Sequence, residues 1–215
     1  MANIRKPTNL LVLKKSTRFI IYIFLILTVI ITTVSCRRTI KGESATEAIF
    51  EVDTTLLQQP FFSNGDIIVG IPVVWISSDS LQKARISHEL KPLAGSTPTL
   101  INAWLGIADS SAMMLSYHNN APLDWIKTLS TKPDIIFNTN HDWLNVQYSH
   151  FIHRQKDIHQ IVLQNKQTLI FRLFIKGEKV NDYYELSFIV HRGFINRIIK
   201  SVESSIGSIN FLNNK

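Results

Sequence analysis

Several side chains that can bind a metal ion lie close together in the second half of the chain: His141, Asp142, His150, His153 and His159. Imidazole nitrogens are common ligands of zinc and copper. On one regular strand His150 and His153 would point to opposite faces, because successive side chains alternate. His153 and His159 could meet across a hairpin, since residues 155–157 favour a turn. We therefore take His153, His159 and His141 as candidate metal ligands, with histidines at the surface or at strand ends as the alternative.

A polar segment ahead of these histidines has the composition of a ligand-contacting loop. Residues 138–143 read Asn-Thr-Asn-His-Asp-Trp, which combines turn-forming residues with an aromatic side chain. Loops often carry binding residues. The alternative is a plain connector whose Trp143 packs on the sheet. Trp104 and Trp125 have apolar neighbours and are predicted to lie in the core.

The sequence holds none of the short motifs that identify common catalytic or nucleotide-binding sites. There is no G-x-S-x-G, P-loop, G-x-G-x-x-G or H-E-x-x-H. The many serines leave open a dispersed Ser/His/Asp site. No residue is assigned a catalytic role, and no cofactor is expected.

The N-terminus has the layout of an export signal that ends at the only cysteine. Five Lys or Arg residues and no acidic residue precede an apolar run over residues 19–31, which is followed by small residues and Cys36. This order is typical of a secretory signal peptide. Val34-Ser35-Cys36 resembles the lipobox of bacterial lipoproteins, although Thr33 stands where an aliphatic residue is expected. The resemblance implies that Cys36 is lipidated; the alternative is an uncleaved membrane anchor.

Removal of this signal changes the charge balance. The whole chain has 23 basic and 16 acidic residues and a net charge of +7, but five of the basic residues precede Cys36. The remaining net charge of +2 (18 basic minus 16 acidic) gives no support for nucleic-acid binding. We expect a signal peptide over 1–35, a lipidated cysteine and tether over 36–60, and one domain over 61–215.

Hydrophobic patterns in this domain predict mainly strands. Alternation of apolar and polar residues indicates strands over 144–152, 158–163, 168–175 and 183–191, which are close enough in sequence to form an antiparallel meander. Two more runs, 100–108 and 112–117, flank a turn. Residues 67–75 resemble an edge strand, because Gly70 and Pro72 interrupt them.

Two helices are predicted beside these strands. Asn120 is expected to cap a short helix over 122–129 that Lys132-Pro133 ends. Isoleucine and valine recur at spacings of three and four over 195–209, which predicts an amphipathic helix that covers a sheet. Gly207 is expected to end this helix or loosen its last turn. The fold class is therefore α+β, an antiparallel sheet with a middle helix and a C-terminal helix packed on it.

The order of these elements resembles the PsbP-like α/β sandwich. Gly65, Pro72 and Trp75 correspond to the opening strand, and the middle and closing helices follow in the expected places. The resemblance spans about residues 61–209 and implies a fold, with no binding residue to carry over. Many members of that group are binding or assembly factors without catalysis.

These observations favour a lipid-anchored binding or assembly module of the bacterial cell envelope. Its expected partners are the membrane, through the lipid, and an unidentified envelope protein. Arg37 is not the acidic residue of an inner-membrane retention signal, so the outer membrane is favoured. The alternative function is a small envelope hydrolase.

Overall fold

An eight-stranded, mostly antiparallel sheet forms the centre of the fold. The computed structural model describes residues 45–59, 62–137 and 143–212, which belong to one compact unit. The strand order is β1-β7-β8-β9-β10-β6-β5-β4, and only β1 joins in parallel. The strands are β1 (Thr46–Glu47), β4 (Trp75–Ser77), β5 (Pro98–Gly106), β6 (Ser111–His118), β7 (Asn145–His153), β8 (Lys156–Gln164), β9 (Thr168–Lys176) and β10 (Tyr183–His191).

The predicted meander is confirmed over β7 to β10. Each of these strands pairs antiparallel with the next, as expected for strands joined by short turns. The β5–β6 hairpin is confirmed as well. Its turn is closed by Asp109, whose carboxylate accepts a hydrogen bond of 3.0 Å from the backbone N–H of Ser111.

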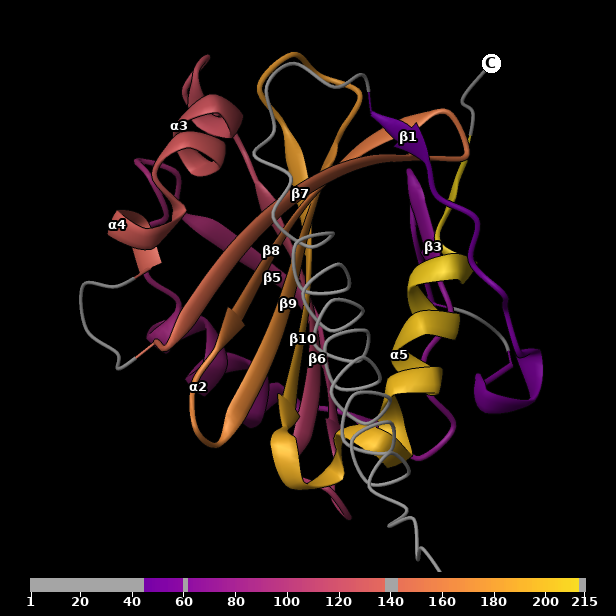
Figure 1. Ribbon diagram of the computed structural model, residues 1–215. Helices are drawn as coiled ribbons and strands as arrows, with labels where there is room; N and C mark the ends of the chain where they lie inside the picture. Colours follow the sequence, from indigo (N-terminus) through magenta and orange to yellow (C-terminus); the bar gives the residue numbers. More distant parts are fainter. Residues whose placement is uncertain (1–44, 60–61, 138–142, 213–215) are drawn as a thin grey trace, which may run out of the picture. The chain divides into compact units, whose positions relative to one another are not determined.

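One face of the large sheet is covered by a small sheet and the C-terminal helix. The small sheet has the order β11-β3-β2 and comprises β2 (Phe62–Asn64), β3 (Ile67–Val69) and β11 (Asn210–Phe211). Helix α5 (Ile195–Ser208) buries Ile198, Val202 and Ile206 in this layer, as its amphipathic pattern predicts. The short helix η2 (Arg192–Phe194) leads into α5 from β10. Figure 1 shows α5 and β3 together on one side of the sheet.

Three helices are associated with the rest of the sheet. Helices α3 (Trp125–Thr131) and α4 (Pro133–Phe137) lie on the side opposite α5 (Figure 1), where Trp125 and Leu129 are buried in a second core. Helix α2 (Ser80–Glu89) packs against β5. Asp79 begins α2 in a capping box with Gln82. The sequence analysis missed α2, because this helix buries no residue and so shows no apolar stripe.

Several predicted details are corrected. Asn120 does not cap the middle helix: it has a φ of 55°, and Asp124 occupies the N-cap position. Lys132-Pro133 ends the middle helix as predicted, since α3 ends at Thr131 with Lys132 as its C-cap, but a further helix, α4, begins at Pro133 itself. The run over 67–75 divides between β3, which is the central strand of the small sheet, and β4, which is an edge strand of the large one.

Part of the segment expected to be a tether is folded. Strand β1 pairs with β7, Asp53 is the N-cap of the 3-10 helix η1 (Thr54–Leu56), and Leu57 is buried. The backbone N–H of Asp53 donates to the Ser204 hydroxyl of α5 at 3.1 Å. The predicted signal peptide and Cys36 lie outside the described residues.

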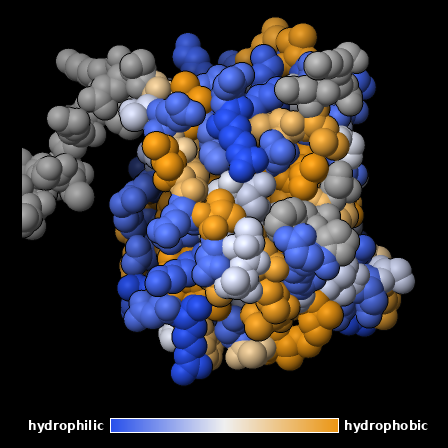
Figure 2. Space-filling model, turned by 90° about the vertical axis from the view of Figure 1, so that its right-hand side faces the viewer, coloured by the Kyte–Doolittle hydropathy of each residue, from blue (hydrophilic) through white to orange (hydrophobic). Residues whose placement is uncertain are grey.

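The side of the molecule that carries α5 has a mixed surface. Figure 2 shows hydrophobic residues in separate clusters among hydrophilic ones on this side. No helix in the described part of the chain is long and apolar enough to cross a membrane.

The close contact between α5 and the chain's first described segment gives a test of this arrangement. Gly207 lies in the last turn of α5, one residue before its end at Ser208, and a Cβ there would approach Phe50 Cβ to 2.6 Å and Val52 Cγ2 to 2.8 Å. We predict that Gly207→Ala lowers the free energy of unfolding by about 1–3 kcal/mol, because overpacking outweighs the better helix propensity of alanine.

Urea denaturation measures this effect. Lys200→Ala on the exposed face of α5 is the control and should change stability by no more than about 0.5 kcal/mol. If Gly207→Ala stabilises the protein, residues 50–52 do not pack against the helix.

Candidate ligand-binding groove

A groove of about 460 Å³ lies on the face of the sheet that carries α3 and α4. Its floor is formed by β6, β8, β9 and β10. Its walls are the residues that follow α2 on one side, and α4 with Trp143 on the other. Grooves of this size with apolar walls and a few polar groups are typical of small-molecule sites.

The floor of the groove holds a buried ion pair. Arg172 donates through Nε to Glu185 Oε1 at 2.7 Å, and its Nη2 lies 2.7 Å from the same oxygen. The Ser187 hydroxyl also donates to Oε1, at 2.6 Å, and His118 Nε2 lies 2.7 Å from Oε2. Each carboxylate oxygen of Glu185 therefore has at least one donor.

This environment keeps Glu185 ionised. Burial on its own raises the pKa of the carboxyl, but the Arg172 charge and the hydrogen bonds from His118 and Ser187 outweigh it and hold the pKa at about 2. A buried charge of this kind is tolerated only when it is paired and hydrogen-bonded.

The strand register brings these side chains together. Across β9 and β10, Ser187 is paired with Arg172, and Glu185 lies one pleat along on the same face. Ser116 of β6 is paired with Glu185 from the other side. All four side chains point away from α5, because residues two apart on a strand share a face.

Aromatic side chains hold Arg172 from the side. Its guanidinium carbon lies 5.0 Å from the ring centroid of Phe137 in α4 and 5.6 Å from that of Phe174 in β9. Such cation–π contacts stabilise a partly desolvated guanidinium and fix its orientation. Helix α4 therefore both forms a wall of the groove and positions its cation.

The opposite wall is fixed by a tight turn and by Trp125. Ala94 and Gly95 have φ values of 46° and 87°, and Leu93 and Ser96 exchange backbone hydrogen bonds across the turn. The indole N–H of Trp125 donates to the Leu93 carbonyl at 2.8 Å. The residues that follow α2 are thereby attached to the second core.

A Ser-His-Glu chain runs beneath the groove. The Ser96 hydroxyl lies 3.1 Å from His118 Nδ1, and His118 Nε2 contacts Glu185. Such a chain can activate a serine nucleophile. However, Ser96 is only 2% exposed, His118 is fully buried, and neither lines the groove. The hydroxyl is closed off from any substrate in the groove, so the chain acts here as a structural link.

The candidate metal ligands do not come together. His153 lies on the α5 face, where its Nε2 is 3.2 Å from the Ile209 carbonyl, whereas His159 lies on the groove face. Within the described residues there is no group of three His, Cys, Asp or Glu side chains that could hold a metal ion. His141 and Asp142 lie outside the described residues, so their part in a metal site stays a prediction.

His159 is instead paired with His150 across the β7–β8 hairpin. The two rings stack with centroids 4.4 Å apart, and Tyr148 Oη lies 2.7 Å from His159 Nδ1. Burial, assisted by the neighbouring His150, lowers the pKa of His159 to about 4. His159 is therefore neutral at pH 7.

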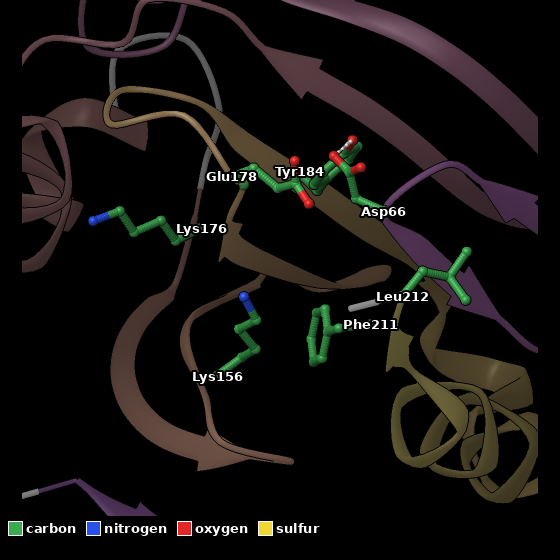
Figure 3. Close-up of a pocket in the computed structure, with 8 residues that line it drawn as sticks. Asp66, Lys156, Lys176, Glu178, Tyr184, Phe211 and Leu212 are labelled. Carbon is green, nitrogen blue, oxygen red and sulfur yellow. Dashed lines mark hydrogen bonds between the residues drawn. The ribbon is translucent and has the colours of Figure 1, made fainter. Parts of the chain in front are cut away.

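A second, smaller hollow lies at the opposite end of the sheet. Its volume is about 300 Å³, and it is lined by Asp66, Glu178 and Tyr184 together with Lys156 and Lys176. The Tyr184 hydroxyl donates to Asp66 at 2.7 Å, and Figure 3 shows Lys176 extending away from the other side chains. Two lysines and two carboxylates line this hollow, so their formal charges sum to zero.

The residues of the groove floor were not among the predicted site residues. Glu185 and Ser187 are the polar residues of the alternating strand over 183–191, and the face they occupy is buried. Arg172 within an otherwise apolar strand was the available signal. Trp104 and Trp125 are buried as predicted, and Trp143 lines the groove; the rest of the predicted loop, 138–142, lies outside the described residues.

Comparison with known proteins gives only remote structural similarities. No model of a protein family matches the chain, and no curated protein matches it. The solution structure of a PsbP from the cyanobacterium Synechocystis sp. PCC 6803 is similar with a TM-score of 0.42 and 7% identity, over 82% of this chain and 99% of that one. The Ran-binding protein Mog1p of Saccharomyces cerevisiae is similar with a TM-score of 0.40 and 9% identity, over 67% and 89%.

The buried ion pair predicts strongly non-additive substitutions. Arg172→Met or Glu185→Gln alone should lower the free energy of unfolding by about 3–5 kcal/mol, because each leaves the other partner without its compensating group. The loss of free energy of unfolding in the double variant should be at least about 1 kcal/mol smaller than the sum of the losses in the two single variants.

Urea denaturation of all four proteins gives the coupling energy. Glu203→Gln on the exposed side of α5 is the control and should have little effect. Additivity of the two single effects to within about 0.5 kcal/mol would contradict the pairing.

Proposed function

We propose that this chain is a lipid-anchored, non-enzymatic binding module of the bacterial cell envelope, and that the groove over β6, β9 and β10 is its ligand site. One observation carries the assignment to the groove. An apolar hollow of about 460 Å³ has a guanidinium, a carboxylate and two serine hydroxyls gathered on its floor. Apolar walls around a few fixed polar groups give both affinity and orientation.

The closed Ser96 is the reason to prefer binding over hydrolysis. A hydrolase with this Ser-His-Glu chain would need the Ser96 hydroxyl within reach of a substrate carbonyl. The hydroxyl is buried in the turn behind His118, and the groove floor presents Arg172 and Ser116 instead. Of the two serines on the floor, Ser187 donates to Glu185, but Arg172 and His118 hold the pKa of this carboxyl at about 2 and make it a weak base. The polar groups at the floor are therefore suited to hold a ligand.

The lipid anchor and the envelope location rest on the sequence. The basic segment, the apolar run and the lipobox-like Val34-Ser35-Cys36 support export and lipidation. A multiply acylated cysteine would hold the domain at the membrane surface, with the outer membrane as the favoured site. The partner from which the groove receives its ligand would then lie in the envelope too.

Site-specific photo-crosslinking in living bacteria tests this function. We expect that p-benzoylphenylalanine at Ile189, which lines the groove, forms an adduct in the full-length protein. The same residue at Val180, which is 72% exposed in the β9–β10 connection, is the matched control and should form none. The measurement is the mass of the purified protein after irradiation.

Two outcomes would contradict the proposal. Equal or absent adducts at both positions would show that the groove is not a ligand site in the cell. The anchoring part is tested in the same cells by Cys36→Ser, which should remove the lipid mass and release the protein from membranes. A variant that is processed and membrane-bound as before would contradict lipidation at Cys36.

A further inference from the structure

The two members of the ion pair are not equally accessible from the groove. The Arg172 side chain is 20% exposed and that of Glu185 only 6%. Glu185 Oε1 receives Arg172 Nε, Nη2 and the Ser187 hydroxyl, and Oε2 is paired with His118. The carboxylate is therefore satisfied and lies behind the guanidinium. Arg172 Nη1 has no acceptor among the described residues, so a ligand in the groove meets a donor.

Ser116 supplies a second donor at the same place. It lines the groove, is 4% exposed, and its hydroxyl has no hydrogen-bond partner in the described part of the chain. Its register position opposite Glu185 places it beside the ion pair. Because Ser116 lines the groove, this hydroxyl is open to an oxygen of a bound ligand.

Apolar side chains continue the floor away from these donors. Ile189 and Ile170 are paired across β10 and β9, one pleat beyond Ser187 and Arg172, and Leu163 follows on β8. Trp143 and Ile136 also line the groove. The site therefore has a donor end and an apolar end, which is the shape of a site for an amphiphile.

We infer that the groove binds a small apolar monocarboxylate, whose carboxylate accepts hydrogen bonds from Arg172 Nη1 and the Ser116 hydroxyl and whose apolar body lies over Ile170 and Ile189. This inference rests on the proposed function. The unequal exposure of the ion pair selects the carboxylate, because the Arg172 side chain is 20% exposed and lies in front of that of Glu185, which is 6% exposed. At the rim Lys91 and Glu89 offset each other. A charge-assisted bond to a guanidinium is stronger than a neutral one. A cationic amine of the same shape would lose both bonds.

Three probes of one shape test the ligand class. The full-length protein in lipid nanodiscs is titrated by calorimetry with 4-phenylbutyrate, 4-phenylbutan-1-ol and 4-phenylbutylamine, with empty nanodiscs as the blank. We expect the acid to bind at least about tenfold more tightly than the alcohol, because the neutral alcohol cannot form the charge-assisted bond to Arg172. We expect the amine not to bind, because its ammonium group and the guanidinium carry charges of the same sign.

Two variants locate the site. Ser116→Ala should weaken binding of the acid about three- to tenfold, whereas Ser201→Ala on α5 should leave it unchanged. Arg172→Gln should abolish the preference for acid over alcohol; if this variant does not fold, Ser116→Ala still decides the site.

Equal binding of acid and alcohol, failure of all three probes, or an unchanged affinity in Ser116→Ala would overturn the inference. If these probes fail while crosslinks still form at Ile189, the ligand class is wrong and the binding function stands. If the crosslinks at Ile189 fail as well, both the ligand class and the proposed binding function are contradicted.

Discussion

The carboxylate of Glu185 is the constraint on which the rest of this face depends. It is buried in the middle of an eight-stranded sheet, where an unpaired charge would cost several kcal/mol. Its partners come from three strands: Arg172 from β9, His118 from β6 and Ser187 from β10. Arg172 in turn needs aromatic cover, which α4 and β9 provide, and His118 needs Ser96 and the packing of Trp125. The helices on this side therefore lie around the polar group rather than over it, and the groove is what remains open.

Most of the fold follows from local patterns in the sequence. The strands from β5 to β10 were predictable because apolar and polar residues alternate along them, and the short turns leave antiparallel pairing as the natural arrangement. Helix α5 was predictable because its stripe of isoleucine and valine is continuous. Helix α2 was not, since its apolar residues Leu81, Ala84 and Ile86 form no continuous stripe and only the Asp79–Gln82 capping box marks it. Gly207 lies in the last turn of α5 as predicted, but its close approach to Phe50 is a tertiary contact that no local pattern reveals.

The groove could not be predicted in the same way. Alternation in β10 shows which residues share a face, but it does not show what covers that face, so the burial of Glu185 and Ser187 could not be predicted. Pairing Glu185 with Arg172 requires the register of the β9–β10 hairpin, which its connection over residues 177–182 does not specify by composition. The histidines misled for a related reason: His153 and His159 are close in sequence, but the register pairs His159 with His150 and leaves His153 on the other face. The residue types indicate which interactions each side chain can make, but only the strand register decides which side chains are close enough to make them together.

The ionisation of Glu185 tests this account most directly. Its pKa of about 2, against an ordinary value of 4.5, means that the carboxylate contributes stability above pH 4.5 that is lost as the pH falls toward 2. The measurement is a pH titration of the glutamate carboxyl carbons by ¹³C NMR, with Glu185 assigned by its absence in Glu185→Gln. The account predicts that the Glu185 signal does not move until the pH falls below about 3. A midpoint at pH 4.5 or above would show that Arg172 and His118 do not hold the carboxylate, and would contradict it.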